Sequence, residues 1–385
     1  MKVLQLISST GFYGAEAVVL GLTQQLKLVG SPATIGVFCN TKHSGSELAE
    51  RAASLGLQVE WIECKGKADL RTVYRIREIL RRREIDTIHS HGYKSHSYAW
   101  LAASRDSCRL IATCHGHYTR SSGGLTFNDF KLRAYRVLEH QILRQFDRVI
   151  CVSDEMRSEL QHAGIAADKL RVIPNGIDVD SFGSAVPAPD LAAIKSGRLA
   201  VGIAARLVER KGHRELLRAA RDLTNQHPET VFFIVGDGPL RQGLELLACE
   251  YGLVNNVIFT GQRTDMPQVY AALDIVALPS QAEGVPMVVI EGMAAQKAVI
   301  ASGVGGIPNM IVHSKTGLLV EPGDHISLRD GLARLLQDAP LRRSLGENAQ
   351  RIVRQRYCRS TMAGNYITEY RKAADPSVVL ATAVI

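Results

Sequence analysis

Residues 274–295 read DIVALPSQAEGVPMVVIEGMAA, and the interpretation of the whole chain begins from this stretch. Its apolar beginning is typical of a buried parallel strand, and a helical pattern follows at residues 288–295. Pro286 suits the first turn of that helix, because its missing N–H would have no intrahelical partner there. The backbone amides of Met287 and Val288 would then be unpaired donors at a positive helix end, which predicts an anion site.

Two carboxylates flank this helix start, Glu283 before it and Glu291 one turn inside it. Glu291 would lie roughly 6 Å below Met287, since each helical residue rises 1.5 Å. At that depth it can accept hydrogen bonds from the vicinal hydroxyls of a ribose, and Glu283 can do the same for a second polyol. The segment is therefore suited to a sugar, a diphosphate and a ribose in a row. Two solvated acids are the simpler alternative, so the rest of the chain must decide.

The composition is that of an ordinary globular protein. The chain has 385 residues, 46% hydrophobic and 22% charged, which is enough for two domains with cores of their own. No run approaches 18 apolar residues, so no transmembrane span is expected, and the first residues are predicted to form a strand and not a signal peptide. Seven cysteines without C-x-x-C spacing predict a reducing, cytoplasmic location.

The net charge of +8 leaves nucleic acid, membrane surfaces and anionic small molecules open as partners. Aromatic residues are sparse and are not interleaved with the basic ones, which argues against nucleic acid. The densest basic stretch, residues 71–83, has the pattern of an amphipathic helix. A solvated face explains its charge more simply than contact with anionic lipid headgroups, which is kept as the alternative.

Strand and helix patterns alternate along most of the chain, which predicts an α/β fold with two doubly wound parallel sheets. Strands are expected at 3–9, 33–39, 59–63, 87–91, 110–115 and 148–153, then at 199–205, 231–235, 257–261, 275–278, 298–301 and 318–320. Helices are expected at 15–28, 46–55, 70–83 and 130–146, then at 214–226, 240–251, 266–273, 326–336 and 341–356. Ligands of such sheets bind at the carboxyl ends of the strands.

The alternation breaks at residues 178–197, whose glycine, serine and proline turns are interpreted as an interdomain linker. This break predicts a first domain of residues 1–182 and a second of residues 198–359, with a cleft between the carboxyl ends of their sheets. Residues 374–385 are expected to form a flexible tail.

Further motifs fall at predicted strand ends. A Gly-Phe-Tyr-Gly14 turn opens the first helix, where glycine lets a phosphate approach the backbone, although the dinucleotide fingerprint G-x-G-x-x-G is absent. Arg206 and Lys211 lie five residues apart across a turn and can converge on a diphosphate, whose charge rises as its bond to a sugar breaks. The turns at Gly236 and Arg263 either line a nucleotide pocket or merely reverse the chain.

Two H-x-H pairs, His89 with His91 and His115 with His117, end strands of the first domain. Residues i and i+2 share a strand face, so a metal site is one interpretation. No Asp or Glu flanks either pair at metal spacing, so no metal is predicted. His89 and His117 are interpreted as structural histidines with satisfied hydrogen bonds.

The spacing of Glu283 and Glu291 resembles the E-x7-E motif of the family 4 retaining glycosyltransferases, which have the GT-B fold. Other stretches are similar to family motifs and occur in the family order. They are the Gly14 turn with Tyr13 in place of a glycine, Pro174-Asn-Gly-Ile-Asp178, Arg206-Leu-x-x-x-Lys211-Gly with Ala205 in place of a glycine, and a glycine-rich Gly303–Pro308 turn that lacks the family's acid.

The resemblance implies two Rossmann-like domains facing each other across a cleft, with helix 360–373 packing back on the first. It implies catalytic roles for His115, Arg206, Lys211 and Glu283, and donor binding by Gly14, Gly236, Arg263, Pro286, Met287, Val288 and Glu291. His115 would hydrogen-bond the transferred sugar, the backbone around Arg263 would contact the nucleobase, and His91 and Tyr118 would lie near the acceptor.

The expected reaction moves a sugar from a nucleoside diphosphate sugar to an acceptor hydroxyl, with retention of configuration and without a metal or other cofactor. Arg206 and Lys211 would neutralise the diphosphate in place of a cation. A lipid-linked glycan of a surface polysaccharide is the expected acceptor, which would place the enzyme in the cytoplasm at the inner membrane face. Three alternatives stay open: an epimerase or phosphorylase of the same fold, a nicotinamide oxidoreductase, which the missing fingerprint disfavours, and a non-catalytic protein that binds sugar nucleotides or polyanions.

Overall fold

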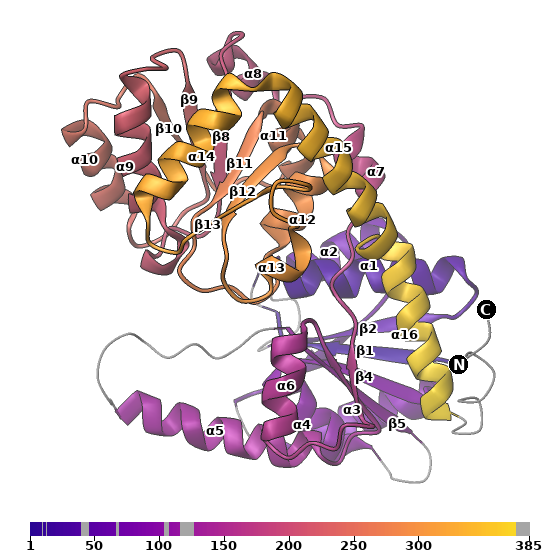
Figure 1. Ribbon diagram of the computed structural model, residues 1–385. Coiled ribbons are helices and arrows are strands. Elements are labelled where there is room, and N and C mark those ends of the chain that lie inside the picture. Colours follow the sequence, from indigo (N-terminus) through magenta and orange to yellow (C-terminus); the bar gives the residue numbers. More distant parts are fainter. Residues whose placement is uncertain are drawn as a thin grey trace. The chain divides into compact units, whose positions relative to one another are not determined.

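The computed structural model describes residues 1–9, 11–12, 14–39, 46–66, 69–103, 108–115 and 127–374, apart from the side chains of 127–134 and 374. The described chain forms two compact units (Figure 1). The first contains Met1–Gly176 and the segment from Arg359 onward, and the second contains Ile177–Cys358. The chain therefore passes from the first unit to the second and then back again.

In the described part of the first unit, seven parallel strands follow the order β3-β2-β1-β4-β5-β6-β7. They are β1 (Val3–Ile7), β2 (Ala33–Cys39), β3 (Gln58–Glu63), β4 (Thr87–His91), β5 (Arg109–Cys114), β6 (Arg148–Cys151) and β7 (Leu170–Val172). β1, β2 and β4 are buried along their whole length, as expected for strands of a parallel sheet covered on both faces. The strand order reverses between β1 and β4, and ligands of such sheets bind at that switch point.

Seven helices of the first unit are described: α1 (Gly14–Leu28), α2 (Glu47–Ser54), α3 (Leu70–Arg83), α4 (Tyr93–Ala102), α5 (Phe127–Leu143), α6 (Asp154–His162) and α16 (Arg359–Ala374). The last of these comes from the end of the described chain and packs along α1 (Figure 1). Its Tyr366 and Tyr370 are fully buried in a cluster with Val3 and Ile111 of the sheet. The first unit therefore owes part of its core to the last described helix.

The described part of the second unit contains six parallel strands in the order β10-β9-β8-β11-β12-β13, which is the Rossmann order. They are β8 (Ala200–Ala204), β9 (Val231–Val235), β10 (Val257–Gly261), β11 (Ile275–Leu278), β12 (Ala298–Ser302) and β13 (Leu318–Val320). The helices are α7 (Val179–Gly183), α8 (Pro189–Lys195), α9 (His213–Thr224), α10 (Arg241–Glu250), α11 (Met266–Ala272), α12 (Met287–Ala294), α13 (Ile307–Met310), α14 (His325–Gln337) and α15 (Ala339–Arg356). The prediction of an α/β fold with two doubly wound parallel sheets is confirmed.

The segment 178–197 is not a linker but part of the second unit. It forms the short helices α7 and α8, whose Val179 and Leu191 are buried in the same core as the strands. The second unit already begins at Ile177, whose amide donates to the carbonyl of Tyr357 at 2.8 Å. Turn residues suggested an open connection here, but two buried apolar side chains outweigh them, since they attach the segment to the core.

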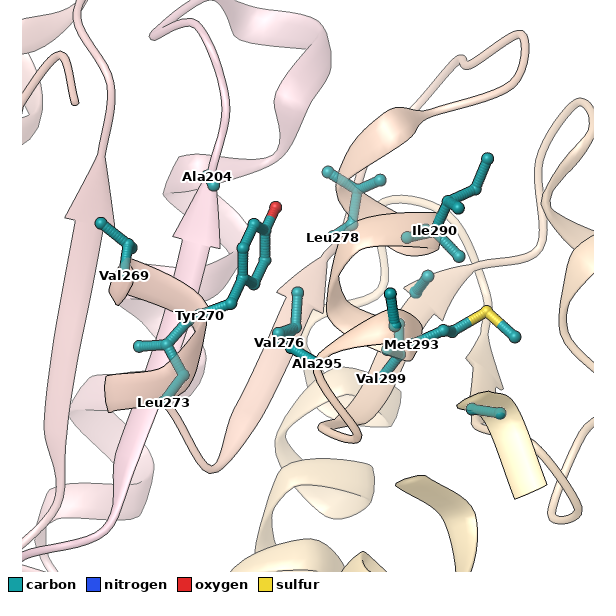
Figure 2. Packing of buried hydrophobic residues seen from close by; sticks show 14 of the residues in the cluster. Ala204, Val269, Tyr270, Leu273, Val276, Leu278, Ile290, Met293, Ala295 and Val299 are labelled. Atoms are coloured by element: carbon teal, nitrogen blue, oxygen red, sulfur yellow. The ribbon is translucent and has the colours of Figure 1, made fainter. Parts of the chain in front are cut away.

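That core packs against one face of the second sheet (Figure 2). Tyr270 of α11 lies in it with Ala204 of β8 and Val276 of β11, and its side chain is fully buried. A buried tyrosine hydroxyl needs a hydrogen-bond partner. Its partner, described below, belongs to the site.

Candidate active site

The loops that follow β8, β9, β11 and β12 are bound to one another at the carboxyl edge of the second sheet. The backbone bonds between neighbouring loops are Leu207 N to Asp237 O at 3.0 Å, Gln281 N to Arg210 O at 2.8 Å and Gly306 N to Gly284 O at 3.0 Å. β8 and β11 are paired at the switch point of this sheet, where ligands bind. The edge therefore brings together the two sequence motifs that were expected to hold a diphosphate and a sugar.

Lys211 and Glu283, 72 residues apart in sequence, meet at this edge. Lys211 Nζ donates to Glu283 Oε1 at 2.5 Å, and Ser280 Oγ donates to the same oxygen at 2.7 Å. The Glu283 side chain is 7% exposed and that of Lys211 16% exposed, so the ion pair is only weakly screened by solvent. Within the described residues, both bonds use Oε1, which leaves Oε2 as the oxygen available to a sugar hydroxyl.

Arg206 lies in the loop directly after β8, next to the fully buried Leu207. The Arg206 residue is exposed, and its guanidinium makes no hydrogen bond or ion pair to any described residue. Lys211 ends a short 3-10 turn, Glu209–Lys211, in the same loop. The structure thus brings Lys211 to Glu283 and leaves the Arg206 guanidinium open to solvent at the same edge.

The helix after Glu283 begins one residue earlier than expected. Pro286 has an extended backbone (φ −73°, ψ 119°) and stands at the N-cap position, outside the helix, so that Met287 is the first helical residue. No side chain caps this helix. The amides of Met287 and Val288 have no hydrogen-bond acceptor among the described residues. Both are therefore free to donate to an anion at this helix start.

Glu291 lies in α12 and is held by Tyr270 of α11. The Tyr270 hydroxyl donates to Glu291 Oε2 at 2.8 Å. Burial raises the pKa of the Glu291 carboxyl, and the bond from Tyr270 opposes that rise. The carboxyl is thereby fixed in orientation, with Oε1 as its second acceptor site.

Gly236 and Arg263 lie at the neighbouring strand ends. Gly236 has φ +128°, and a Cβ there would stand 2.1 Å from the carbonyl oxygen of Ala205, so only glycine lets these two loops approach. The Arg263 side chain is bound to Asp265 at 2.8 Å and to Asp190 at 2.6 Å, and these two bonds raise its pKa. Because these two carboxylates hold the guanidinium, the expected contact to a nucleobase would be made by the backbone around Arg263.

The first unit places Gly14, His91 and His115 at the carboxyl edge of its own sheet. Gly14 is the first residue of α1, His91 is the last residue of β4, and His115 follows β5. His91 Nδ1 and His115 Nε2 are 2.8 Å apart, so the structure brings these two residues together. Tyr118 and His117 lie outside the described residues.

Both ring nitrogens of His89 and His91, and Nε2 of His115, make hydrogen bonds within the described residues. His89, interpreted as structural, bonds the Tyr370 hydroxyl and the Thr113 hydroxyl, each at 2.7 Å. Burial is the main reason that the pKa values of His89 and His91 lie well below the usual value, and it lowers that of His115 to about 4. Among the described residues, no group of three or more His, Cys, Asp or Glu side chains is arranged to hold a metal.

Comparison with known proteins identifies the family. The model of Glycosyltransferase Family 4 matches residues 12–181, and that of Glycosyl transferases group 1 matches residues 192–352. The D-inositol 3-phosphate glycosyltransferase of Corynebacterium jeikeium is 31% identical over 283 residues, which are 69% of this chain and 67% of the relative. The chain belongs to the family 4 glycosyltransferases.

Other relatives of this glycosyltransferase differ in the compounds that their names mention. The UDP-Gal:alpha-D-GlcNAc-diphosphoundecaprenol alpha-1,3-galactosyltransferase of Escherichia coli is 27% identical over 71% of this chain and 72% of its own length. The chain spans 67%, 66% and 61% of the lengths of three D-inositol 3-phosphate glycosyltransferases. The crystal structure of Anabaena HepE with UDP, 22% identical, covers 97% of this chain and 100% of its own, with a TM-score of 0.81, and shows the shared GT-B fold.

Three buried polar residues of this glycosyltransferase were missed by sequence reasoning: Ser280, Tyr270 and Gln5. Gln5 carried a usable signal, because it interrupts the apolar run Val-Leu-Gln-Leu-Ile of a strand expected to be buried on both faces. A polar group in that position must find a hydrogen-bond partner. Tyr270 and Ser280 carried no comparable signal, since their partners are set by the way the loops meet.

Gly305 packs directly against the backbone of the Glu283 loop, and a substitution at Gly305 is expected to disrupt this loop. Gly305 has φ +53°, and a Cβ would stand 1.9 Å from the carbonyl oxygen of Glu283. Gly305→Ala should therefore destabilise the second unit by about 3 kcal/mol, from the left-handed backbone and the clash together. Gly243→Ala is the control, because its Cβ would meet no atom within 4 Å and helix α10 should gain about 1 kcal/mol. Equal unfolding midpoints for the two variants in calorimetry would contradict this account.

The buried histidines predict that acid destabilises the first unit. His96 and His115 have pKa values lowered to about 3 and about 4, mainly by burial, and His89 and His91 shift in the same direction. An unfolded histidine takes up a proton near pH 6.5, so the unfolded state binds more protons and stability falls as the pH drops from 6.5 toward 4. Burial raises the pKa of Glu139 to about 7, which has the opposite effect between pH 7 and 4.5 and offsets about one histidine.

The expected slope is about 4 kcal/mol per pH unit at its steepest, from a net three protons of these groups, and the lowered pKa of His140 adds to it with the same sign. Both tryptophans of the chain, Trp61 and Trp100, lie in the first unit. Urea unfolding followed by tryptophan fluorescence at pH 7.5 and pH 5 therefore reports on this unit. A stability that does not change between these pH values would show that the histidines are not buried as neutral rings.

Proposed function

We propose that this enzyme transfers a glycosyl group from a nucleoside diphosphate sugar to an acceptor hydroxyl with retention of configuration. The observation that carries the proposal is the meeting of Lys211 and Glu283 beside the uncapped start of α12. A cation, two free amides and two fixed carboxylates at one sheet edge match the parts of a sugar nucleotide. The diphosphate would be bound by Lys211, Arg206 and the amides of Met287 and Val288. The ribose would be bound by Glu291, and the transferred sugar by Glu283.

In the proposed reaction, the bond between the anomeric carbon and the diphosphate oxygen breaks, and a bond from that carbon to the acceptor oxygen forms on the same face. The hydroxyl proton passes to the departing phosphate, which acts as the base. Negative charge grows on the diphosphate as the bond breaks, and Lys211 and Arg206 stabilise it there. These two cations take the role that a metal ion has in other transferases, so we expect activity in the presence of EDTA.

The names of the relatives guide the choice of substrates. One relative is named for UDP-galactose and a diphosphoundecaprenol-linked sugar, one is named GDP-mannose-dependent, and several are named for D-inositol 3-phosphate. We propose a lipid-linked glycan of surface polysaccharide synthesis as the acceptor and an anionic membrane surface as the place of work. The basic helix α3 is only partly available for such a surface, because Arg75, Arg82 and Arg83 pair with Glu63 and Glu60. No described helix is both long enough and apolar enough to cross a bilayer.

A thermal-shift screen of UDP- and GDP-sugars tests the donor, since a ligand that binds the folded state raises the unfolding temperature. The donor that binds is then incubated with and without a diphosphoundecaprenol-linked sugar or D-inositol 3-phosphate, and release of the nucleoside diphosphate is measured. The proposal is supported if release depends on the acceptor and the new glycosidic bond has the same axial or equatorial configuration as the sugar–phosphate bond of the donor. Inversion of the linkage would contradict the proposed retention.

The same assay separates the rival functions. An epimerase or phosphorylase of this fold would convert the donor without an added hydroxyl acceptor. A binding protein would shift its unfolding temperature with a sugar nucleotide and release nothing under any condition. A change of nicotinamide absorbance on turnover would indicate an oxidoreductase.

A further inference from the structure

A continuous chain of hydrogen-bonded side chains connects α16 to His115 in the first unit. Its members in order are Tyr366, Thr113, His89, Tyr370, Gln5, His91 and His115, and successive polar atoms are 2.7–3.1 Å apart. The first six members are at most 3% exposed. Because water is excluded from these groups, each must satisfy its neighbour, and the direction of one bond constrains the next.

Gln5 sets the direction of the bonds that lead to His115. An amide side chain has one end that only donates and one that only accepts. Gln5 Nε2 donates to Tyr370 Oη at 3.1 Å, and Gln5 Oε1 is 2.8 Å from His91 Nε2. A carbonyl oxygen can only accept, so the proton of His91 must be on Nε2.

The bond between His91 and His115 then fixes the proton of His115 on Nε2. Burial lowers the pKa of both His91 and His115, so each ring is neutral and carries one proton. His91 Nδ1 is then without a proton and accepts from His115 Nε2 at 2.8 Å. His115 Nδ1 is left as a bare acceptor. This atom is buried, has no hydrogen-bond partner among the described residues, and belongs to a ring that lines a cavity of about 390 Å³ with Gly92 and Cys114.

Tyr370 holds the Gln5 amide in this orientation. Gln5 Nε2 can only donate to the Tyr370 oxygen, so the acceptor left for the Tyr370 hydroxyl proton among the described residues is His89 Nδ1 at 2.7 Å. If the amide turned over, every bond would reverse, and His115 Nδ1 would become a donor. Removing the Tyr370 hydroxyl takes away the group that favours one amide orientation.

We propose that Gln5 and Tyr370 are positioning residues that hold His115 as the neutral Nε2–H tautomer, with Nδ1 as the acceptor for a substrate hydroxyl. The role of His115 toward substrate rests on the proposed function, whereas its tautomer does not. A neutral acceptor suits glycosyl transfer, because positive charge develops on the sugar ring in the transition state and an imidazolium would oppose it. Nothing else in the chain of contacts would select this tautomer if Gln5 were apolar.

The tautomer is measured directly by nitrogen NMR on the full chain labelled with ¹⁵N-histidine, with His115→Gln used to assign the signals. We expect one set of His115 signals, protonated at Nε2. Tyr370→Phe should produce a mixture of both tautomers, and Gln5→Leu should do the same. Tyr98→Phe is the matched control, since it removes a similarly buried tyrosine hydroxyl of the first unit whose partners, Cys64 and the Asp69 amide, lie outside the hydrogen-bonded chain, and it should leave His115 unchanged. Gln5→Glu should preserve the tautomer, because a carboxylate still accepts from His91 Nε2.

Kinetics supply a second measurement once the donor is known. Tyr370→Phe should lower kcat about tenfold with the donor KM unchanged, as expected for the loss of one oriented hydrogen bond, and Tyr98→Phe should not. His115 protonated at Nδ1 in the unchanged protein, or a His115 signal unaffected by Tyr370→Phe, would overturn the proposal. If the protein proves not to transfer sugars while the NMR result holds, the proposed function fails and the positioning chain stands.

Discussion

Replacing Lys211 with glutamine is expected to lower kcat for release of the nucleoside diphosphate about 1000-fold. The charge that develops on the departing diphosphate is largest in the transition state, so the loss should fall on kcat more than on the donor KM. The substitution should leave the fold intact. Glu283 keeps its 2.7 Å bond from Ser280, and a glutamine amide at position 211 can still donate to it.

Arg210→Gln is the matched control for this prediction. Arg210 precedes Lys211 in the same 3-10 turn and is exposed, so its replacement removes the same charge from the same loop. It should keep nearly full activity, because a solvated charge outside the pocket contributes little to a transition state. Near-normal turnover by Lys211→Gln, or an equal loss in both variants, would refute the role given to Lys211.

Glu291→Ala is the second large effect, expected to weaken donor binding about 100-fold or more. Two ribose hydroxyls donating to a carboxylate are together worth about 3 kcal/mol or more, and alanine removes both acceptors. The same change leaves the buried Tyr270 hydroxyl without its partner, so stability should also fall, by about 1–3 kcal/mol. Donor affinity is read from the thermal-shift titration and stability from urea unfolding.

The double variant Glu291→Ala with Tyr270→Phe separates these two effects. Removing the tyrosine hydroxyl as well should recover most of the stability, because no polar group then remains buried and unpaired. Donor binding should stay weak. If the double variant regained donor affinity together with stability, Glu291 would be a structural partner of Tyr270 and not a ligand of the ribose.

The two-sheet architecture was predictable because the strands of parallel sheets are apolar throughout and alternate with amphipathic helices. The alternation predicts doubly wound parallel sheets but does not select their strand order, since more than one order is compatible with it. The limit between the units was not predictable, since α7 and α8 are held by single buried side chains such as Val179 and Leu191 among many turn residues. Pro286 was expected in the first turn of α12 but stands at the N-cap, because proline is compatible with both positions.

The part of the candidate site that lies at the ends of neighbouring strands was predictable from the sequence. Lys211 and Glu283 each follow a strand of one sheet, so their proximity was within reach of the sequence. The pairing of Glu291 with Tyr270 and the chain from Gln5 to His115 were not, because they depend on how helices and loops pack. The cleft expected between the two sheets and the roles of Gly14, His91 and Tyr118 stay predictions.

The position of α16 has a consequence for how the protein is made. Tyr366 and Tyr370 fill the core of the first unit and satisfy the buried polar atoms of Thr113, His89 and Gln5. A nascent chain has these strands long before it has α16, which emerges only after the whole second unit. The second unit, contained within Ile177–Cys358, is complete earlier and is expected to fold first, so the buried polar atoms of the first unit are expected to stay unmatched until α16 has emerged.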